Sequence, residues 1–87
     1  MAWTVKWTAK AADALSRFDK PVARRIRDYM LKRVAPAENP RTLGKALRGP
    51  LREYWRYRIG AYRAICEIRD QEIIIVVVLV DHRKDAY

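Results

Sequence analysis

The fold is decided by residues 51–80, LREYWRYRIGAYRAICEIRDQEIIIVVVLV, in which apolar and aromatic residues recur at about every second position. Alternation with a period of two predicts β-strands that bury one face. We predict three strands, Leu51–Ile59, Ala61–Arg69 and Glu72–Val80. Gly60 makes a tight link between the first two, and the RDQE stretch makes a turn between the second and the third. The segment is therefore predicted to form an antiparallel meander.

The last strand of the meander differs from the others because IIIVVVLV, residues 73–80, is apolar at every step. A strand without a polar side is typical of a strand covered on both faces. We therefore expect this strand to be central in the sheet. The polar residues that follow, DHRKDAY at 81–87, are predicted to leave the sheet as a tail.

Upstream of the meander, the pattern predicts one strand, two helices and a loop. Residues 2–7 alternate like a strand with one buried face. Thr8 is a suitable cap for a first helix, and Pro21 suits the first turn of a second. The helical apolar stripes are Ala11, Leu15 and Phe18, then Val22, Ile26, Tyr29, Met30 and Val34. Residues 35–50 are rich in proline and glycine and are predicted to be largely loop, with one helical turn in RTLGKAL.

These elements predict an α+β fold of order β-α-α-β-β-β, with a helical hairpin packed on one face of a small antiparallel sheet. With 87 residues, the chain is expected to be a single domain over 1–87. No apolar stretch approaches the roughly 20 residues of a membrane-spanning helix. We therefore expect a cytoplasmic protein that does not use the membrane.

The charge of the chain points to an anionic partner. Lys and Arg number 19 against 10 Asp and Glu, which gives a net charge of +9 and an isoelectric point near 10.2. Nucleic acid is the first partner to consider for such a domain, and an acidic protein is served by the same field. The single cysteine, Cys66, excludes an internal disulfide and is expected to be a small buried residue.

The basic residues of the meander share a face with an aromatic residue. Alternation places Arg52, Tyr54, Arg56 and Arg58 on one side of the first strand, and Arg63 can project to the same side from the next. Guanidinium groups that converge favour a bridging phosphate, and tyrosine among arginines suits single-stranded RNA. The alternative is an ordinary solvated face whose side-chain stems cover apolar surface.

Other kinds of chemistry lack their residues. One histidine, one cysteine and no carboxylate cluster at ligand spacing give neither a zinc site nor a two-metal nuclease, so no metal or other cofactor is expected. The chain has no glycine-rich phosphate loop and no serine with a histidine base. His82 is a candidate acid or base beside Arg83, although a lone histidine is more often incidental.

LRGPLREYWRYRIGAYRAICEI at 47–68, the apolar strand after it and HRKDAY at 82–87 together resemble the RelE branch of the RelE/ParE superfamily of bacterial toxins. The resemblance covers nearly the whole chain, and the predicted element order is also that of the family. It implies a toxin of a type II toxin–antitoxin system that enters the ribosomal A site and cuts the messenger RNA there. It further implies cleavage by the ribose 2′-hydroxyl without a metal.

The resemblance also implies roles for individual residues. Arg56 and Arg58 match the family's two basic strand residues, commonly lysines, and Arg63 matches the arginine of the next strand. Arg83 matches a candidate proton donor, and Tyr87 a tyrosine that stacks on the cut nucleotide. Because arginine does not readily act as an acid or base, His82 is the better proton carrier. The predicted RNA contacts outside this catalytic set are Lys45, Arg48, Arg52 and Tyr54.

The implied partners are messenger RNA, the ribosome and a cognate antitoxin of the RelB type, acidic and partly disordered when free. Two alternatives remain. A ParE-like toxin on the same fold inhibits DNA gyrase and cuts nothing, but such toxins tend to lack the clustered basic residues and the terminal tyrosine. A non-catalytic RNA-binding module is supported by charge alone.

Overall fold

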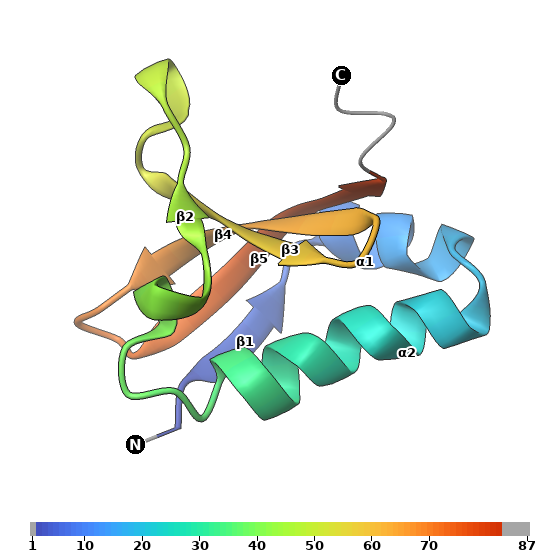
Figure 1. The fold of residues 1–87 in the computed structure, drawn as a ribbon, viewed down its shortest axis with the longest axis horizontal. Helices are drawn as coiled ribbons and strands as arrows, with labels where there is room; N and C mark the ends of the chain where they lie inside the picture. Colours follow the sequence, from blue (N-terminus) through green and yellow to red (C-terminus); the bar gives the residue numbers. More distant parts are fainter. Residues whose placement is uncertain (1, 83–87) are drawn as a thin grey trace.

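The computed structural model of the chain describes residues 2–82 and shows two helices packed on one face of a five-stranded sheet (Figure 1). The strands are β1 (Thr4–Trp7), β2 (Lys45–Ala46), β3 (Tyr54–Ile59), β4 (Tyr62–Arg69) and β5 (Ile74–His82). The helices are α1 (Ala9–Arg17) and α2 (Lys20–Tyr29). The strand order is β1-β5-β4-β3-β2. The predicted α+β fold with its helical hairpin is thereby confirmed.

The helices begin where the sequence predicts. Thr8 caps α1, because the Ala11 amide donates to its Oγ1 at 3.1 Å. Pro21 lies in the first turn of α2, where its missing amide hydrogen is not needed. The α2 helix continues directly into a π-helical turn over Met30–Val34. One stripe of each helix is buried against the sheet.

In the sheet, β3, β4 and β5 form the predicted antiparallel meander. Gly60 has a φ of +60° in the two-residue link between β3 and β4, a conformation that glycine adopts without a Cβ clash. The first strand, β1, runs parallel to β5, so the sheet is mixed and not wholly antiparallel. Two short 3-10 helices, Pro40–Leu43 and Gly49–Leu51, flank β2.

The core lies between the helices and one face of the sheet. Tyr57 is fully buried there, and its hydroxyl donates to the Pro40 carbonyl at 2.8 Å, so the largest core side chain keeps its polar atom satisfied. Cys66 is buried as predicted. The other buried core residues are Ala11, Leu15, Ala23, Ile26, Met30, Val34, Ile59, Ala64, Ile75, Val77 and Val80.

Several strand boundaries differ from the prediction: β1, β4 and β5 each begin one or two residues later than predicted, and two further boundaries bear on the site. The strand predicted from Leu51 begins at Tyr54, because Pro50 lies in a 3-10 turn that leaves residues 52 and 53 outside the ladder. The strand predicted to end at Val80 continues to His82, because Asp81 pairs with an arginine on β4. Asp81 and His82 therefore belong to the sheet and not to the polar tail.

Two further features of the sheet differ from the prediction. The helical turn predicted in the loop forms at Pro40–Leu43, but the loop also contains β2, whose two residues pair with β3. The β5 strand has a neighbour on each side, but α1 and α2 cover only one of its faces, and Ile74, Val76 and Leu79 remain half-buried. The uncovered face of the sheet is called the open face below.

Candidate functional site

The open face carries two cross-strand rows of side chains, and five of its residues are basic. In the first row, Lys45 on β2 lies opposite Arg56 on β3, and Arg56 lies opposite Ile65 on β4. In the second row, Arg58 lies opposite Arg63, and Arg63 lies opposite Asp81 on β5. These rows contain Lys45, Arg56, Ile65, Arg58, Arg63 and Asp81, and Arg69 lies further along β4 on the same face. Directly opposed side chains on one face are within reach of each other, so the rows form a single basic surface.

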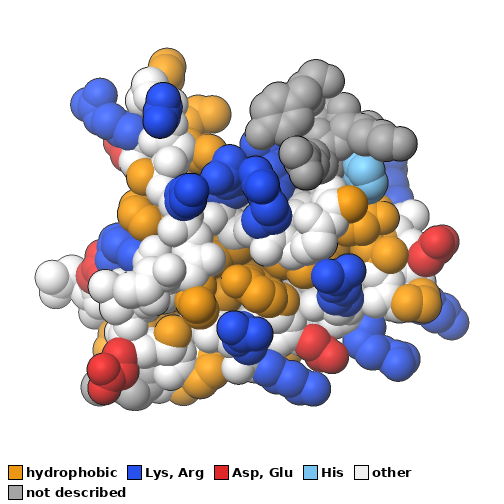
Figure 2. Space-filling view, viewed as in Figure 1, with side chains coloured by type: hydrophobic (Ala, Val, Ile, Leu, Met, Phe, Trp, Pro, Cys, Tyr) orange, Lys and Arg blue, Asp and Glu red, His pale blue; other side chains and the backbone are white. Residues whose placement is uncertain are grey.

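Lys and Arg side chains gather on this surface in the space-filling view, beside the projecting segment that joins β2 to β3 (Figure 2). A groove of about 290 Å³ opens here, lined by Thr42, Leu43, Gly44, Lys45, Arg56 and Arg58. Among residues 2–82, neither Arg56 nor Arg58 has a carboxylate within salt-bridge distance. Within the described part of the chain, their positive charge therefore faces the groove without an internal counter-ion.

The segment 40–44 contacts β3 closely, and these contacts place Lys45 at the edge of the sheet beside β3. The Trp55 Nε1 donates to the Arg41 carbonyl at 3.1 Å. Gly44 lies so near β3 that a Cβ in its place would overlap the Arg56 carbonyl oxygen and come within 2.8 Å of the Trp55 ring. A residue with a side chain would push the segment away from β3, so glycine allows β2 to add to the sheet edge.

Arg63 is held by Asp81 in a two-pronged ion pair. Its Nε donates to Asp81 Oδ1 at 2.8 Å and its Nη2 donates to Oδ2 at 3.1 Å. The two side chains are 23% and 19% exposed, so solvent screens the pair only in part. Asp81 is the residue of this surface that the sequence did not reveal as a partner, because the strand was predicted to end before it.

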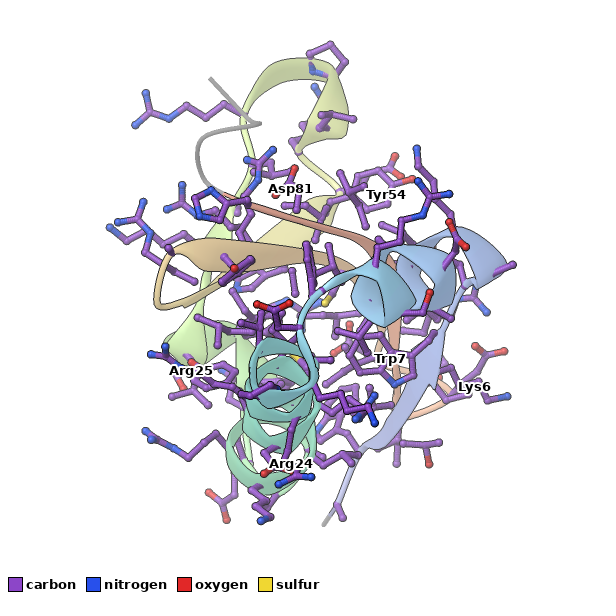
Figure 3. The ribbon with its side chains drawn as sticks, turned by 90° about the vertical axis from the view of Figure 1, so that its right-hand side faces the viewer. Lys6, Trp7, Arg24, Arg25, Tyr54 and Asp81 are labelled. Atoms are coloured by element: carbon purple, nitrogen blue, oxygen red, sulfur yellow. The ribbon has the colours of Figure 1, made fainter. Side chains whose placement is uncertain are left out.

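His82 lies apart from the two rows. It is opposite Tyr62 in the register, and its ring packs edge-on against the Tyr62 ring with centroids 4.8 Å apart. Tyr62 in turn packs against Phe18 at 5.0 Å. His82 therefore shares the helix-covered side of the sheet with these aromatics, whereas Asp81 and Tyr54 lie on the open side (Figure 3).

The remaining predicted site residues divide between the projecting segment and the end of the chain. Arg48 and Arg52 are exposed and flank the Gly49–Leu51 turn, so Arg52 does not share the strand alternation that the sequence predicted. Tyr54 is half-buried and lies opposite Glu67. Arg83 and Tyr87 lie outside the described residues.

A second basic groove adjoins the open face at Arg58. It measures about 580 Å³ and lies between α2 and the β3–β4 turn. The Arg25 guanidinium covers Gly60, where a Cβ would come within 2.7 Å of Nη1. Figure 3 shows Arg25 on the side of this turn and Arg24 pointing away from the sheet. The groove is lined by Arg25, Asp28, Tyr29, Lys32, Arg33, Arg58, Ile59 and Gly60.

The described residues include no group of three or more His, Cys, Asp or Glu side chains placed to hold a metal ion. Burial raises the pKa of the Cys66 thiol, so this cysteine stays protonated and unreactive at neutral pH. Neither helix over residues 2–82 has the length and apolar run that crossing a bilayer requires.

The sequence and the fold match a class of known proteins. The model of the family described as the ParE toxin of the type II toxin–antitoxin system parDE matches residues 5–87. The chain therefore belongs to this family and is a type II toxin of the RelE/ParE superfamily, which confirms the resemblance seen in the sequence.

Relatives within the superfamily carry RelE names. The chain is 29% identical over 87 residues to toxin RelG of Mycobacterium tuberculosis, covering 100% of this chain and 98% of that toxin. It is similar to a chain of the RelBE2 toxin–antitoxin complex of the same organism, with 26% identity, a TM-score of 0.88 and coverage of 95% and 93%. A mutant of the E. coli toxin RelE in the free state shares the fold at 20% identity, a TM-score of 0.75 and coverage of 99% and 88%.

Proposed function

We propose that this toxin is a ribosome-dependent endoribonuclease that cuts messenger RNA in the ribosomal A site. The observation that carries the proposal is the open face, where Arg56 and Arg58 face a groove without a carboxylate partner in the described chain and Arg63 lies in the same row as Arg58. Guanidinium forks bind phosphate oxygens in two-pronged fashion. The face is therefore suited to an RNA backbone whose phosphate gains charge during reaction.

In the proposed reaction, the ribose 2′-oxygen attacks the adjacent phosphorus, and the bond from phosphorus to the 5′-oxygen of the next nucleotide breaks. The 2′-hydroxyl loses a proton to solvent, the leaving 5′-oxygen gains one, and the products are a 2′,3′-cyclic phosphate and a 5′-hydroxyl. The step consumes no water. An additional negative charge develops on the phosphoryl oxygens at the transition state. Arg56, Arg58 and Arg63 stabilise that charge, a form of catalysis in which one lost donor costs about 10²–10³ in rate.

Stabilisation of the leaving group and nucleotide stacking are assigned to residues at the end of the chain. Arg83, which matches the family's candidate proton donor, is proposed to donate a hydrogen bond to the leaving oxygen while solvent supplies the proton, because arginine does not readily act as an acid. Tyr87 is proposed to stack on the cut nucleotide. His82 is a weaker proton carrier than the sequence suggested, because its register places it on the side away from the three arginines. Lys45, Arg48, Arg52 and Tyr54 are proposed to hold the flanking RNA, all of them on or beside the groove and the projecting segment.

The partner that restrains the toxin is proposed to be an acidic, RelB-like antitoxin. Support comes from the RelBE2 structure, in which the similar chain is part of a toxin–antitoxin complex. A net charge of +9 favours an acidic partner that covers the basic face and folds on binding. Toxin and antitoxin are expected to act in the cytoplasm, where messenger RNA is translated.

A gyrase inhibitor is the second candidate, because the family model is named for ParE. The similarity to RelG and to a chain of the RelBE2 complex supports a RelE-like function over a ParE-like one. The basic open face also favours a ribonuclease, because its arginine side chains are suited to binding the phosphates of RNA. Inhibition of gyrase requires no phosphate chemistry.

Primer extension on a defined messenger tests the proposal in a reconstituted translation system, with and without ribosomes. We expect cuts within the A-site codon in the presence of ribosomes and an intact message in their absence. A supercoiling assay with purified DNA gyrase runs in parallel. An intact message together with loss of supercoiling would overturn the nuclease and establish the gyrase inhibitor.

A further inference from the structure

Asp81 is a carboxylate in the middle of a basic surface. It lies in the same cross-strand row as Arg58 and Arg63. A negative charge here repels an RNA phosphate and weakens binding to the open face. Its presence therefore calls for a role other than binding RNA.

The contact between Asp81 and Arg63 fixes the arginine rather than merely neutralising it. Two parallel hydrogen bonds, Nε to Oδ1 at 2.8 Å and Nη2 to Oδ2 at 3.1 Å, define the plane of the guanidinium. Both side chains are mostly covered, at 23% and 19% exposure, so the pair is better ordered than an exposed ion pair. A single acceptor leaves such a side chain free to rotate, whereas a two-pronged contact does not.

The row also explains the direction in which Arg63 is held. Arg63 has Arg58 on one side, from β3, and Asp81 on the other, from β5. Like charges on adjacent strands repel each other, and an opposite charge on the far side draws Arg63 toward β5. Two guanidiniums can therefore stand on the open face before any phosphate is present to bridge them.

We infer that Asp81 is a positioning residue that holds the Arg63 guanidinium in the orientation needed at the transition state. The inference rests on the proposed ribonuclease function and adds to it a residue that is not itself in contact with RNA. Asp81 weakens the binding of RNA and speeds its cleavage. The two effects have opposite signs, and this distinguishes positioning from binding.

The test compares Asp81→Asn and Asp81→Glu with the wild-type toxin in single-turnover cleavage on programmed ribosomes. Asp81→Asn keeps the size of the side chain and removes the charge and one acceptor. We expect it to lower the cleavage rate at saturating toxin by about 10–100-fold, because small misplacements of a catalytic group have effects of this size. The toxin concentration at half-saturation is expected to stay equal or fall. Asp81→Glu, which can form the fork again, is expected to recover part of the rate.

The chain supplies a matched control in Asp70. Asp70 accepts two hydrogen bonds of 2.8 Å from the two terminal nitrogens of Arg41, in a forked pair that is more exposed and lies away from the two rows. Asp70→Asn therefore removes the same charge from a forked pair outside the site, and its cleavage rate is expected to match the wild type. Thermal unfolding of all variants separates a loss of folded protein from a loss of rate.

Several results would overturn the inference. An unchanged or faster rate in Asp81→Asn would make Asp81 a bystander or a restraint on Arg63. A rate loss explained by weaker binding or by unfolding would reduce it to a structural residue. In the Arg63→Ala background, a further loss from Asp81→Asn would show that Asp81 does not act through Arg63.

The Arg63 Nε–H resonance, measured by NMR on the free toxin, tests positioning independently of cleavage. We expect it to be ordered in the wild type and Asp81→Glu and averaged in Asp81→Asn. Equal order in all three proteins would contradict the inference whether or not the toxin cuts RNA. Inactive wild-type toxin on ribosomes, by contrast, would overturn the proposed function.

Discussion

The two faces of the sheet are built from the same strands and have opposite properties. On β3, Tyr57 and Ile59 face the helices and are 0% and 3% exposed, whereas Arg56 and Arg58 between them face the groove. On β4, Ala64 and Cys66 are buried beside Arg63. Successive residues of one strand therefore serve different purposes, because side chains alternate across the sheet.

This difference predicts that stability and activity can be changed separately. Residues under the helices set the free energy of unfolding, since they exclude water from the core. Residues of the open face contribute little to the core and are proposed to carry the chemistry. Substitutions at neighbouring positions in one strand should thus produce different kinds of defect.

The largest effect is expected on the helix-covered face, at Ile75. Ile75 is 0% exposed, so Ile75→Ala removes apolar contacts and leaves a cavity, at a cost of about 2–5 kcal/mol in unfolding free energy. Urea denaturation measures this loss. The adjacent Val76 is half-buried on the open side, and Val76→Ala is expected to cost much less. Equal losses at the two positions would contradict the assignment of the faces.

The next effect concerns activity and not stability. Arg63→Ala is expected to lower the cleavage rate by about 100-fold or more, since it removes a charge that stabilises the transition state. The free energy of unfolding should fall by only about 1–2 kcal/mol, from the half-buried Asp81 that loses its partner.

Arg69 supplies the control for this prediction on the same strand. It pairs with Glu67 at 2.7 Å, away from the two rows, and Arg69→Ala removes the same charge. We expect it to cut at nearly the wild-type rate. A folded Arg63→Ala protein that cuts like Arg69→Ala would remove Arg63 from the site.

The two tyrosines of β3 lie on opposite faces of the sheet, and removal of the hydroxyl oxygen from each one tests the difference between the faces. Tyr57→Phe removes the hydroxyl that donates to the Pro40 carbonyl at 2.8 Å and is expected to cost about 1–2 kcal/mol. Tyr54 is on the open face, and Tyr54→Phe should change stability by less than about 0.5 kcal/mol. Denaturation curves measure the loss of unfolding free energy in both variants. A larger loss in Tyr54→Phe than in Tyr57→Phe would contradict the assignment of the two faces.

The buried hydroxyl also predicts a loss of stability at alkaline pH. Burial raises the pKa of Tyr57 above its unfolded value, so the folded state keeps a proton that the unfolded state releases. Its stabilising effect is complete below about pH 10, the unfolded pKa, and declines as the pH rises above it. When the free energy of unfolding is measured from pH 8 to 11, it should decline less steeply above pH 10 in Tyr57→Phe than in the wild type. Parallel curves would show that Tyr57 does not contribute.

The smallest effect is expected at the exposed Arg41–Asp70 pair. A hydrogen bond from Arg41 lowers the pKa of Asp70, so its stabilising effect is present above about pH 4, the unfolded pKa, and is lost as the pH falls through the lower folded pKa. Asp70→Asn should cost less than about 1 kcal/mol at neutral pH, because solvent screens the pair. The difference from the wild type should shrink in acid. A constant difference across pH 2–7 would contradict this origin.

The parts of the fold that follow apolar periodicity could be predicted from the sequence. Both helices and the meander follow from the spacing of residues such as Leu15, Ile26 and Tyr57, because burial of one face leaves a regular pattern. The two-residue strand β2 leaves no such pattern. It forms because Gly44 allows close approach to β3, which is a contact across the chain and not a local preference.

The candidate site shows the same limit. The arginines of β3 and β4 could be assigned to one face by alternation, and the register places them there. Asp81 was missed because a charged residue after an apolar run resembles the end of a strand. Its pairing with Arg63, 18 positions earlier, offsets the cost of keeping it in the sheet. The predicted alternation also failed for Arg52, because Pro50 turns the chain before the ladder begins.

The proposed activity depends on the open face and not on the overall positive charge. The most direct measurement compares ribosome-dependent cleavage by two double variants, Arg56→Ala with Arg58→Ala and Arg24→Ala with Arg27→Ala. Each removes two positive charges from a total net charge of +9, but Arg24 and Arg27 are exposed on α2 and line neither basic groove. We predict a loss of about 100-fold or more in the first variant and little change in the second. Equal losses in both would contradict the claim and assign the activity to charge alone.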